Sequence, residues 1–275
     1  MWCKYAAVAA DSLERLKGDS IAILEYHLGD VFENTDAVER MMYYFGGSIP
    51  LPSAIFDGTR MVIGGDLETF SSYLSAYQDE MLYASPGAIN LVVDYDSTTR
   101  FLKVKSRATA IDTVSNAYLR YAVAESHIHH HWQLDSLHHV VRKMLPDYNG
   151  VAFSINPGES FVDSQTYLLD STWNDKNCCV VVFVQRDDAD KPVLRSAKSG
   201  LFQIPTWVFG DANGDGSVDV SDIIYLMDYL FVPGPPPDPF SSGDPNYDCI
   251  VDISDAVYLI NYFFVNGPAP LKGCA

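Results

Sequence analysis

The sequence predicts a multidomain α+β protein in which a mixed helix–strand region, an all-β region and a small helical module follow one another. Three observations predict this fold class. Helix-forming and strand-forming stretches alternate over residues 1–84. Strand-like runs separated by turn-forming residues occupy 87–204, as in a β-sandwich. An acidic motif then repeats with a period of 33 residues within 210–270.

The first region, 1–84, is expected to form an α/β domain. Helices are predicted at residues 6–16, 34–45 and 66–82, and strands at 21–26, 54–56 and 61–63. Asn34 or Thr35 is a suitable cap for the second helix. The Asp57-Gly58 pair between the last two strands is a strong hairpin signal. The resulting order, αβαββα, is typical of α/β architecture.

The second region, 87–204, is expected to form a sandwich of antiparallel strands. Strands are predicted at residues 89–93, 101–108, 118–125, 151–155, 166–169, 179–185 and 193–197. The stretch 138–145 fits either a strand or a helix. Short strands at this spacing are typical of an immunoglobulin-like sandwich.

Charge sets limits on the partners. The chain of 275 residues carries a formal net charge of −18, which disfavours nucleic acid and anionic membranes and favours metal cations. Half of the excess lies in residues 211–275, where ten Asp face a single Lys. No apolar run approaches the ~18–20 residues that a transmembrane helix needs. No signal peptide is recognised at Met1, and five cysteines are too few for a disulfide framework.

The acidic repeat has the ligand spacing of a calcium loop. Oxygen side chains recur at loop positions 1, 3, 5, 9 and 12, and a backbone carbonyl serves at position 7. The predicted ligands of one ion are Asp211, Asn213, Asp215, Ser217, Asp219 and Asp222. Those of a second ion are Asp244, Asn246, Asp248, Ile250, Asp252 and Asp255. The sequence therefore predicts two Ca²⁺ ions, one in each loop.

Each loop leads into an apolar helix. The first apolar set is Ile223, Ile224, Leu226, Met227, Leu230 and Phe231, and the second is Val257, Leu259, Ile260, Phe263 and Phe264. Helices this apolar are expected to pack on each other.

The two loop–helix units resemble dockerins, which lack the entering helix of an EF-hand. In that family, loop positions 10 and 11 and one helix face bind a cohesin domain. The matching residues here are Val220, Ser221, Ile253 and Ser254. Asp228 and Asn261 stand where cellulosomal dockerins often carry a basic residue. The resemblance implies a small helical domain with paired EF-hand-like loops at 210–270, and a cohesin-like partner.

Cys3 lies just before the first predicted helix, where the helix dipole favours the reactive thiolate form. Pro52 precedes a strand, as the cis-proline of a thioredoxin fold does. Upstream residues also resemble Omp28-related proteins, which join a thioredoxin-like domain to a β-domain. The matching stretches are Trp2-Cys3, Tyr26-His27, Leu51–Gly58, His139–Arg142 and Val182–Gln185. The resemblance implies a thioredoxin-like domain at 1–84, without its first strand, and a β-sandwich at 87–204.

The resemblance makes Cys3 and Pro52 candidate catalytic residues, although the second cysteine of the dithiol motif is replaced by Ala6. Without a resolving thiol, intramolecular dithiol exchange is closed. The favoured function is therefore a secreted or cell-surface calcium-binding protein, attached through its dockerin, rather than an enzyme. Two alternatives stay open: a monothiol oxidoreductase that uses Cys3, and a dockerin-bearing glycoside hydrolase component of polysaccharide degradation.

Histidines and the remaining cysteines offer further candidates. His127, His129, His130, His131, His138 and His139 are dense enough to hold a transition metal, although strand alternation would separate them. Cys178-Cys179 begins an apolar strand and is expected to be buried. Cys249 and Cys274 each sit near the end of a repeat and could pair.

Overall fold

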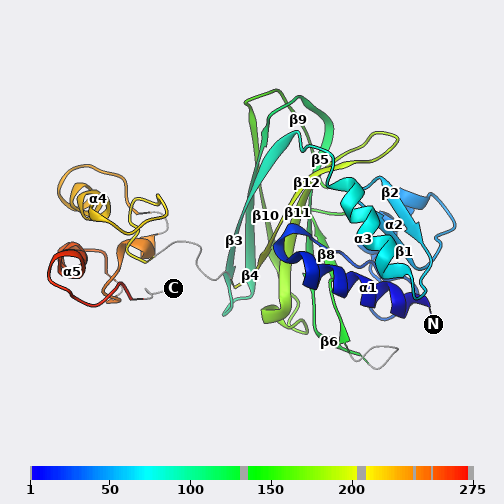
Figure 1. The fold of residues 1–275 in the computed structure, drawn as a ribbon, viewed down its shortest axis with the longest axis horizontal. Coiled ribbons are helices and arrows are strands. Elements are labelled where there is room, and N and C mark those ends of the chain that lie inside the picture. Colours follow the sequence, from blue (N-terminus) through cyan, green and yellow to red (C-terminus); the bar gives the residue numbers. More distant parts are fainter. Residues whose placement is uncertain (1, 131–135, 203–208, 238–239, 249, 272–275) are drawn as a thin grey trace. The chain divides into compact units, whose positions relative to one another are not determined.

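The computed structural model describes residues 2–130, 136–202, 209–237, 240–248 and 250–271 (Figure 1). Its contacts divide the chain into two compact units, Met1–Phe202 and Gln203–Ala275. The first unit combines helices with mostly antiparallel sheets, and the second is helical. The mixed, sheet-rich α+β class that the sequence predicts is therefore what the chain adopts.

The first unit is built from three helices and twelve strands within the described ranges. Its helices are α1 (Trp2–Lys17), α2 (Thr35–Phe45) and α3 (Thr69–Glu80), with short 3-10 turns at Gly18–Ser20 and Asp175–Asn177. Its strands are β1 (Ser53–Phe56), β2 (Arg60–Ile63), β3 (Gly87–Asp96), β4 (Phe101–Ala110), β5 (Val114–Glu125), β6 (Ile128–His129), β7 (Ser136–Leu137), β8 (Val140–Leu145), β9 (Val151–Ile155), β10 (Ser160–Leu168), β11 (Cys178–Arg186) and β12 (Val193–Gly200).

Two antiparallel sheets face each other around the largest core. One has the order β10-β4-β3, and the other has the order β12-β11-β5-β8, with β9 also pairing with β5. Leu102 and Val104 from the first sheet and Tyr121, Val123 and Val182 from the second are among the buried residues of this core. Strand alternation fixes which side chains face inward, because a shift of one residue would expose the whole apolar set.

The central strands β5 and β11 are buried on both faces, which explains their continuous apolar runs. A second cluster lies on the face away from the three-stranded sheet, where Val181 and Phe183 of β11 pack near Leu24 and Tyr26. Figure 1 shows the helices α1–α3 and the β1–β2 hairpin beside the larger sheets. The helical layer and the sandwich therefore share buried surface.

The predicted strand at 21–26 does not form. Glu25 makes only an isolated parallel bridge to Val140, donating its amide to the His139 carbonyl (2.8 Å) and accepting from the Val141 amide (2.9 Å). Ala22, Leu24 and Tyr26 of this stretch are partly buried against β8 and β11, which accounts for its apolar sequence. The segment meets β8 at this single point and forms no ladder, because burial alone does not make a strand.

Other predicted elements occur with shifted ends. The first helix begins at Trp2, so Cys3 lies inside its first turn rather than before it. Asn34 caps α2 by accepting from the Ala37 amide at 3.0 Å. The hairpin turn has positive φ angles at Asp57 (42°) and Gly58 (80°). The ambiguous stretch 138–145 becomes the strand β8.

The second unit contains two main helices, α4 (Val220–Phe231) and α5 (Ile253–Phe264), and a 3-10 turn at Phe240–Gly243. Their shared core is formed by Ala212, Ile223, Leu226, Ala256 and Leu259. The two helices therefore pack on each other, as their apolar content predicts.

Candidate functional site

The two acidic loops organise their backbones around their first aspartate. Asp211 accepts hydrogen bonds from the amides of Gly214 (2.9 Å), Asp215 (3.1 Å) and Gly216 (2.9 Å). In the second loop, Asp244 accepts from Tyr247 (2.9 Å) and Asp248 (3.2 Å).

The fourth position of both loops takes a left-handed conformation. Gly214 has a φ of 73°, and Tyr247 has a φ of 65°. That conformation is uncommon for a bulky residue, so the tight turn is retained in the second loop although its glycine is absent. The two loops therefore have the same local geometry.

The last two predicted ligands of each loop also start the helix. Asp219 caps α4, and Asp222 three residues later closes a capping box. Asp252 and Asp255 form the same box at α5. A capping box satisfies otherwise unpaired amides at a helix N-terminus. Capping therefore accounts for the Asp at positions 9 and 12, but not for the polar residues at positions 1, 3 and 5.

Four of these carboxylates are buried. Asp211 and Asp244 are 2% exposed, and Asp222 and Asp255 are 0% exposed. One Asp255 oxygen, Oδ1, is buried and has no hydrogen-bond partner. Buried charge of one sign is costly unless something compensates it. A buried carboxylate oxygen without a partner fits a cation.

Electrostatics in the loops follow this crowding. Burial raises the pKa of Asp255 to about 6, and the charges of Asp244 and Asp248 add to the effect. Burial likewise raises the pKa of Asp222, with Asp211 and Asp215 contributing. Crowding therefore makes the ionised form of these carboxylates costly. A bound divalent cation would stabilise that ionised form.

Metal binding depends on how the possible ligands in the two acidic loops are arranged. Among the residues that the structure describes, no group of three or more His, Cys, Asp or Glu side chains is arranged so that it could hold a metal ion. The predicted ligand set also uses Asn213 and Asn246 and the carbonyls of Ser217 and Ile250. Asn213 donates to Asp215 (2.9 Å), and Asn246 donates to Asp248 (3.0 Å), so these side chains are adjacent. Calcium binding stays a prediction.

Both helices expose an apolar stripe. The sequence assigns Val220 and Ile253 to a partner surface and the other members of the stripes to packing between the helices. The stripe on α4 consists of Val220 (45% exposed), Ile224 (58%), Met227 (38%) and Phe231 (65%). The stripe on α5 consists of Ile253 (46%), Val257 (46%), Ile260 (40%) and Phe264 (66%). Every member of one stripe has its equivalent 33 residues later in the other. The signal lay in the sequence, since a helix that is apolar on more than one face needs a second partner.

The predicted partner residues lie at the start of these stripes. Val220 and Ile253 are the first residues of α4 and α5. The hydroxyls of Ser221 and Ser254 are occupied within their own loops, where they accept from Asn213 (2.8 Å) and Asn246 (2.7 Å). The apolar members of the predicted set are therefore the ones available to a partner.

The predicted thiol site lies in the helical layer. Cys3 is partly exposed and reduced. Burial raises the pKa of nearby Tyr73 to about 12, with smaller contributions from Glu25 and then Cys3. Pro52 is buried, follows a cis peptide bond, and accepts from the Gly64 amide at 2.8 Å.

Histidines of the predicted cluster divide among different neighbours. His127 packs edge-on against His138, at 4.6 Å between ring centroids, and His130 packs on Phe32. His139 is buried, and its Nε2 lies 3.2 Å from a Glu14 carboxylate oxygen. Burial lowers the pKa of His139, which opposes the effect of Glu14. His131 lies outside the described residues.

Cysteines 178 and 179 are unsuited to thiolate chemistry. Cys178 is buried, and burial together with Glu125 raises its pKa to about 12. Burial raises the pKa of Cys179 to about 11. Cys249 and Cys274 lie outside the described residues.

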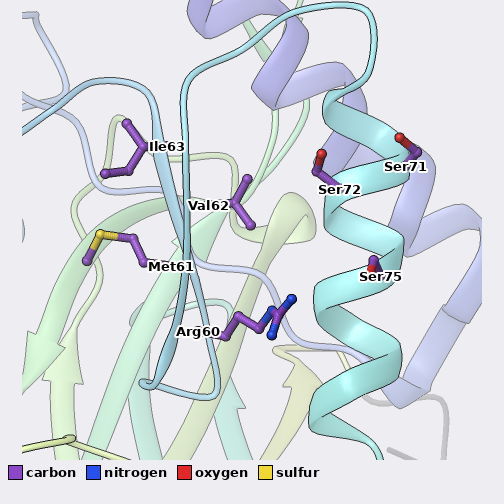
Figure 2. Close-up of a pocket in the computed structure, with 7 residues that line it drawn as sticks. All are labelled: Arg60, Met61, Val62, Ile63, Ser71, Ser72 and Ser75. Carbon is purple, nitrogen blue, oxygen red and sulfur yellow. The ribbon is translucent and has the colours of Figure 1, made fainter.

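An open groove runs between β2 and α3, and Figure 2 shows its lining. Its volume is about 690 Å³, and its lining residues are Arg60, Met61, Val62, Ile63, Ser71, Ser72 and Ser75. Val62 and Arg60 point toward the helix in this view, whereas Met61 and Ile63 point away. None of the residues predicted for catalysis lines it.

The arrangement defines a multidomain α+β protein that joins a helix-covered sandwich to a duplicated acidic loop–helix unit. No known family model and no curated protein matches the chain. Among solved structures, HBP35 of Porphyromonas gingivalis is similar, with 16% identity and a TM-score of 0.51 over 64% of this chain. This match spans 62% of HBP35, and it indicates a shared fold alone.

Two further structures show weaker similarity. A domain of the outer membrane lipoprotein Omp28 from Porphyromonas gingivalis is 15% identical, with a TM-score of 0.33 over 42% of this chain and 88% of that domain. Protein AGR_C_4864 from Agrobacterium tumefaciens is 16% identical, with a TM-score of 0.48 over 73% of this chain and 89% of its own. Within the described ranges, no helix has the length and apolar character required to cross a bilayer.

Proposed function

We propose that this chain is a secreted or cell-surface calcium-binding protein that attaches to a protein partner through a dockerin-like second unit. Its first unit is then a thioredoxin-like and sandwich region of the Omp28-related type, carried as a binding region. The observation that carries the proposal is the duplicated loop. Two stretches 33 residues apart bury equivalent aspartates and lead into helices with equivalent apolar stripes.

Calcium fits the chemistry of these loops. Hard carboxylate, amide and carbonyl oxygens are its preferred ligands, and residues at this spacing can wrap around one ion. Asp211, Asp215, Asp219 and Asp222 and the Asn213 side chain would hold the first ion with the Ser217 carbonyl. Their equivalents from Asp244 to Asp255 would hold the second. Extracellular calcium modules have weak sites that fill at about millimolar concentrations, which supports a secreted or surface location.

The apolar stripes support attachment to a protein. Exposed apolar side chains gathered on one helix face are typical of protein-binding surfaces. We assign them to a cohesin-like domain with an apolar contact surface. Asp228 and Asn261 border the stripes in place of basic residues, so the expected partner need not present an acidic rim.

The test is binding to purified cohesin domains with and without calcium. Ile224→Asp and Val257→Asp are introduced together, because the two stripes are chemically alike. The matched control is Val232→Asp with Val265→Asp, exposed apolar residues just beyond the two helices. The proposal predicts calcium-dependent binding that the first pair abolishes and the control pair preserves. Equal loss with both pairs, or binding that ignores the stripes, would refute attachment through this surface.

A further inference from the structure

A row of positive charge crosses the three-stranded sheet of the first unit. Strand β4 alternates buried residues such as Leu102, Val104 and Ser106 with outward residues. Lys103, Lys105 and Arg107 are all exposed at the outward positions between them. Because the buried set fixes the register, the three cations must lie on the same outer face. We refer to Lys103, Lys105 and Arg107 as the basic row.

The basic row is central and continuous. Strand β4 is the middle strand of the sheet, with β3 on one side and β10 on the other. Successive outward side chains along a strand are about 6.6–6.8 Å apart. The three cations therefore form a straight line about 13 Å long down the middle of an open face.

Nearby carboxylates balance the basic row only in part. None of the ion pairs among the described residues includes a member of the basic row. The carboxylates on the same face belong to β3, where Asp94 is opposite Lys103 and Asp96 is opposite Phe101. Lys105 and Arg107 face Val92 and Asn90 instead. Three unpaired cations on one strand, in a chain of net charge −18, favour an external anion.

The neighbours of the basic row indicate the kind of anion. On β10, Thr166 is opposite Lys103 and Ser164 is opposite Lys105. Their hydroxyls, with the Asn90 amide, offer hydrogen bonds to a ligand rich in hydroxyl groups. Among the described outward residues of β3, β4 and β10, the one exposed aromatic is Phe101, which lies at one end of the row. Single-stranded nucleic acid is usually held by aromatic residues between the cations, so this face is poorly suited to it.

The negative net charge favours a thin linear polymer over an anionic membrane as the ligand of the basic row. Charges further away than about 8 Å are largely screened at physiological salt. A linear polymer lying on β4 therefore senses mainly the basic row, whereas an extended anionic bilayer would also be repelled by the net negative charge of the chain, −18. We propose that the outer face of β4 binds a linear anionic polysaccharide, whose carboxylate or sulfate groups contact Lys103, Lys105 and Arg107 in succession.

The experiment measures binding of the full chain to polygalacturonate and to heparin, as carboxylated and sulfated probes, at low and physiological salt. The test variant carries Lys103→Gln, Lys105→Gln and Arg107→Gln. The control carries Lys4→Gln, Arg15→Gln and Lys176→Gln, which remove the same charge from other exposed positions. Thermal unfolding of both variants confirms that the fold is kept.

The proposal predicts that wild-type protein binds at least one probe, less tightly as salt rises, and that the test variant binds about tenfold more weakly or worse. The control is expected to stay within about twofold. An absence of binding to both probes, or an equal loss in the control, would overturn it. So would stronger, row-dependent binding to phosphatidylserine vesicles, because the ligand would then be a membrane.

Discussion

At the scale of single residues, Asp255 links the acidic loops to pH. Its pKa is raised to about 6 by burial and by Asp244 and Asp248, so the folded module binds protons more tightly than the unfolded chain. The stability from this group is present at low pH and is lost as pH rises through about 6. We expect the metal-free module to melt at a higher temperature at about pH 5 than at about pH 7.5.

Calcium should show the opposite dependence, because protons compete with the ion for the same oxygens. Its affinity is expected to fall as pH drops below about 6. Calorimetric melting and calcium titration at the two pH values provide the measurement. Asp255→Asn should remove much of the pH dependence of the metal-free midpoint. A wild-type midpoint that rises with pH over this range would contradict the assignment.

Glu25 is a second residue whose pKa is shifted by burial. Burial raises its pKa from 4.5 to about 8, with a smaller contribution from the nearby carboxylate of Asp11. Its contribution to stability is therefore present below about pH 4.5 and is lost as pH rises through about 8. Glu25→Gln should stabilise the first unit at about pH 8.5 by on the order of 2 kcal/mol, and by much less near pH 5. Urea unfolding at both pH values tests this, and an equal effect at both would refute it.

Cys3 lies in the first turn of α1, with Ala6 one turn later. We expect the protein to be inactive in insulin reduction, because no resolving thiol can complete dithiol exchange. Ala6→Cys should introduce a pair able to form a disulfide, detectable by thiol titration after oxidation. Turnover at a rate typical of thioredoxins in the unaltered protein would instead support the oxidoreductase alternative.

At the scale of elements, α2 is held to the sandwich by a buried polar cluster. Arg40 of α2 donates to the Gln185 side-chain oxygen at 2.7 Å, and Arg120 of β5 donates to the same oxygen at 3.2 Å. All three side chains are at most 2% exposed. Tyr43 and Tyr44 cover the Arg40 guanidinium at 4.6 and 5.1 Å. Gln185 is therefore the shared acceptor of two buried cations.

Replacing Gln185 by Met should destabilise the first unit by about 3 kcal/mol, because both guanidinium groups lose an acceptor in a buried environment. Gln78→Met, at an exposed position of α3, is the matched control and should change stability by less than about 0.5 kcal/mol. Chemical denaturation of the full chain measures both. A loss no larger than that of the control would show that the cluster contributes little.

Periodicity predicted most elements but not their partners. The runs that became β5 and β11 were recognisable because strands buried on both faces are continuously apolar. The stretch 21–26 is also apolar, yet it meets β8 only through the single bridge of Glu25 to Val140 and forms no strand. The exposed stripes on α4 and α5 were predicted only in part: Val220 and Ile253 were assigned to a partner, whereas the other members were assigned to packing, since apolar content alone does not separate packing from docking. Contacts such as Arg40 to Gln185 join residues far apart in sequence, and no local pattern reveals them.

A candidate site could be predicted from the sequence only when its residues lie close together along the chain. The acidic loops could be located from spacing because each lies within twelve consecutive residues. The basic row was not predicted, because its meaning depends on the sheet that places β4 in the centre. The histidines come together only in part: His127 packs against His138, whereas His130 and His139 contact Phe32 and Glu14.

At the scale of the whole molecule, the two units have different sources of stability. The first unit has an extensive core between two sheets, whereas the second, among its described residues, has a small one formed by five buried residues and their neighbours. Small domains rely more heavily on bound ions. Calcium should therefore affect the second unit strongly and the first only weakly.

The central claim is tested most directly by hydrogen exchange and calorimetry on the full chain during a calcium titration. The account predicts two bound ions, slower amide exchange in α4 and α5, and unchanged exchange in the sandwich strands. Asp211→Ala and Asp244→Ala should each remove one ion and loosen both helices, because the helices share a core. If calcium binds with no defined stoichiometry and leaves exchange in α4 and α5 unchanged, the second unit is not a calcium-folded module.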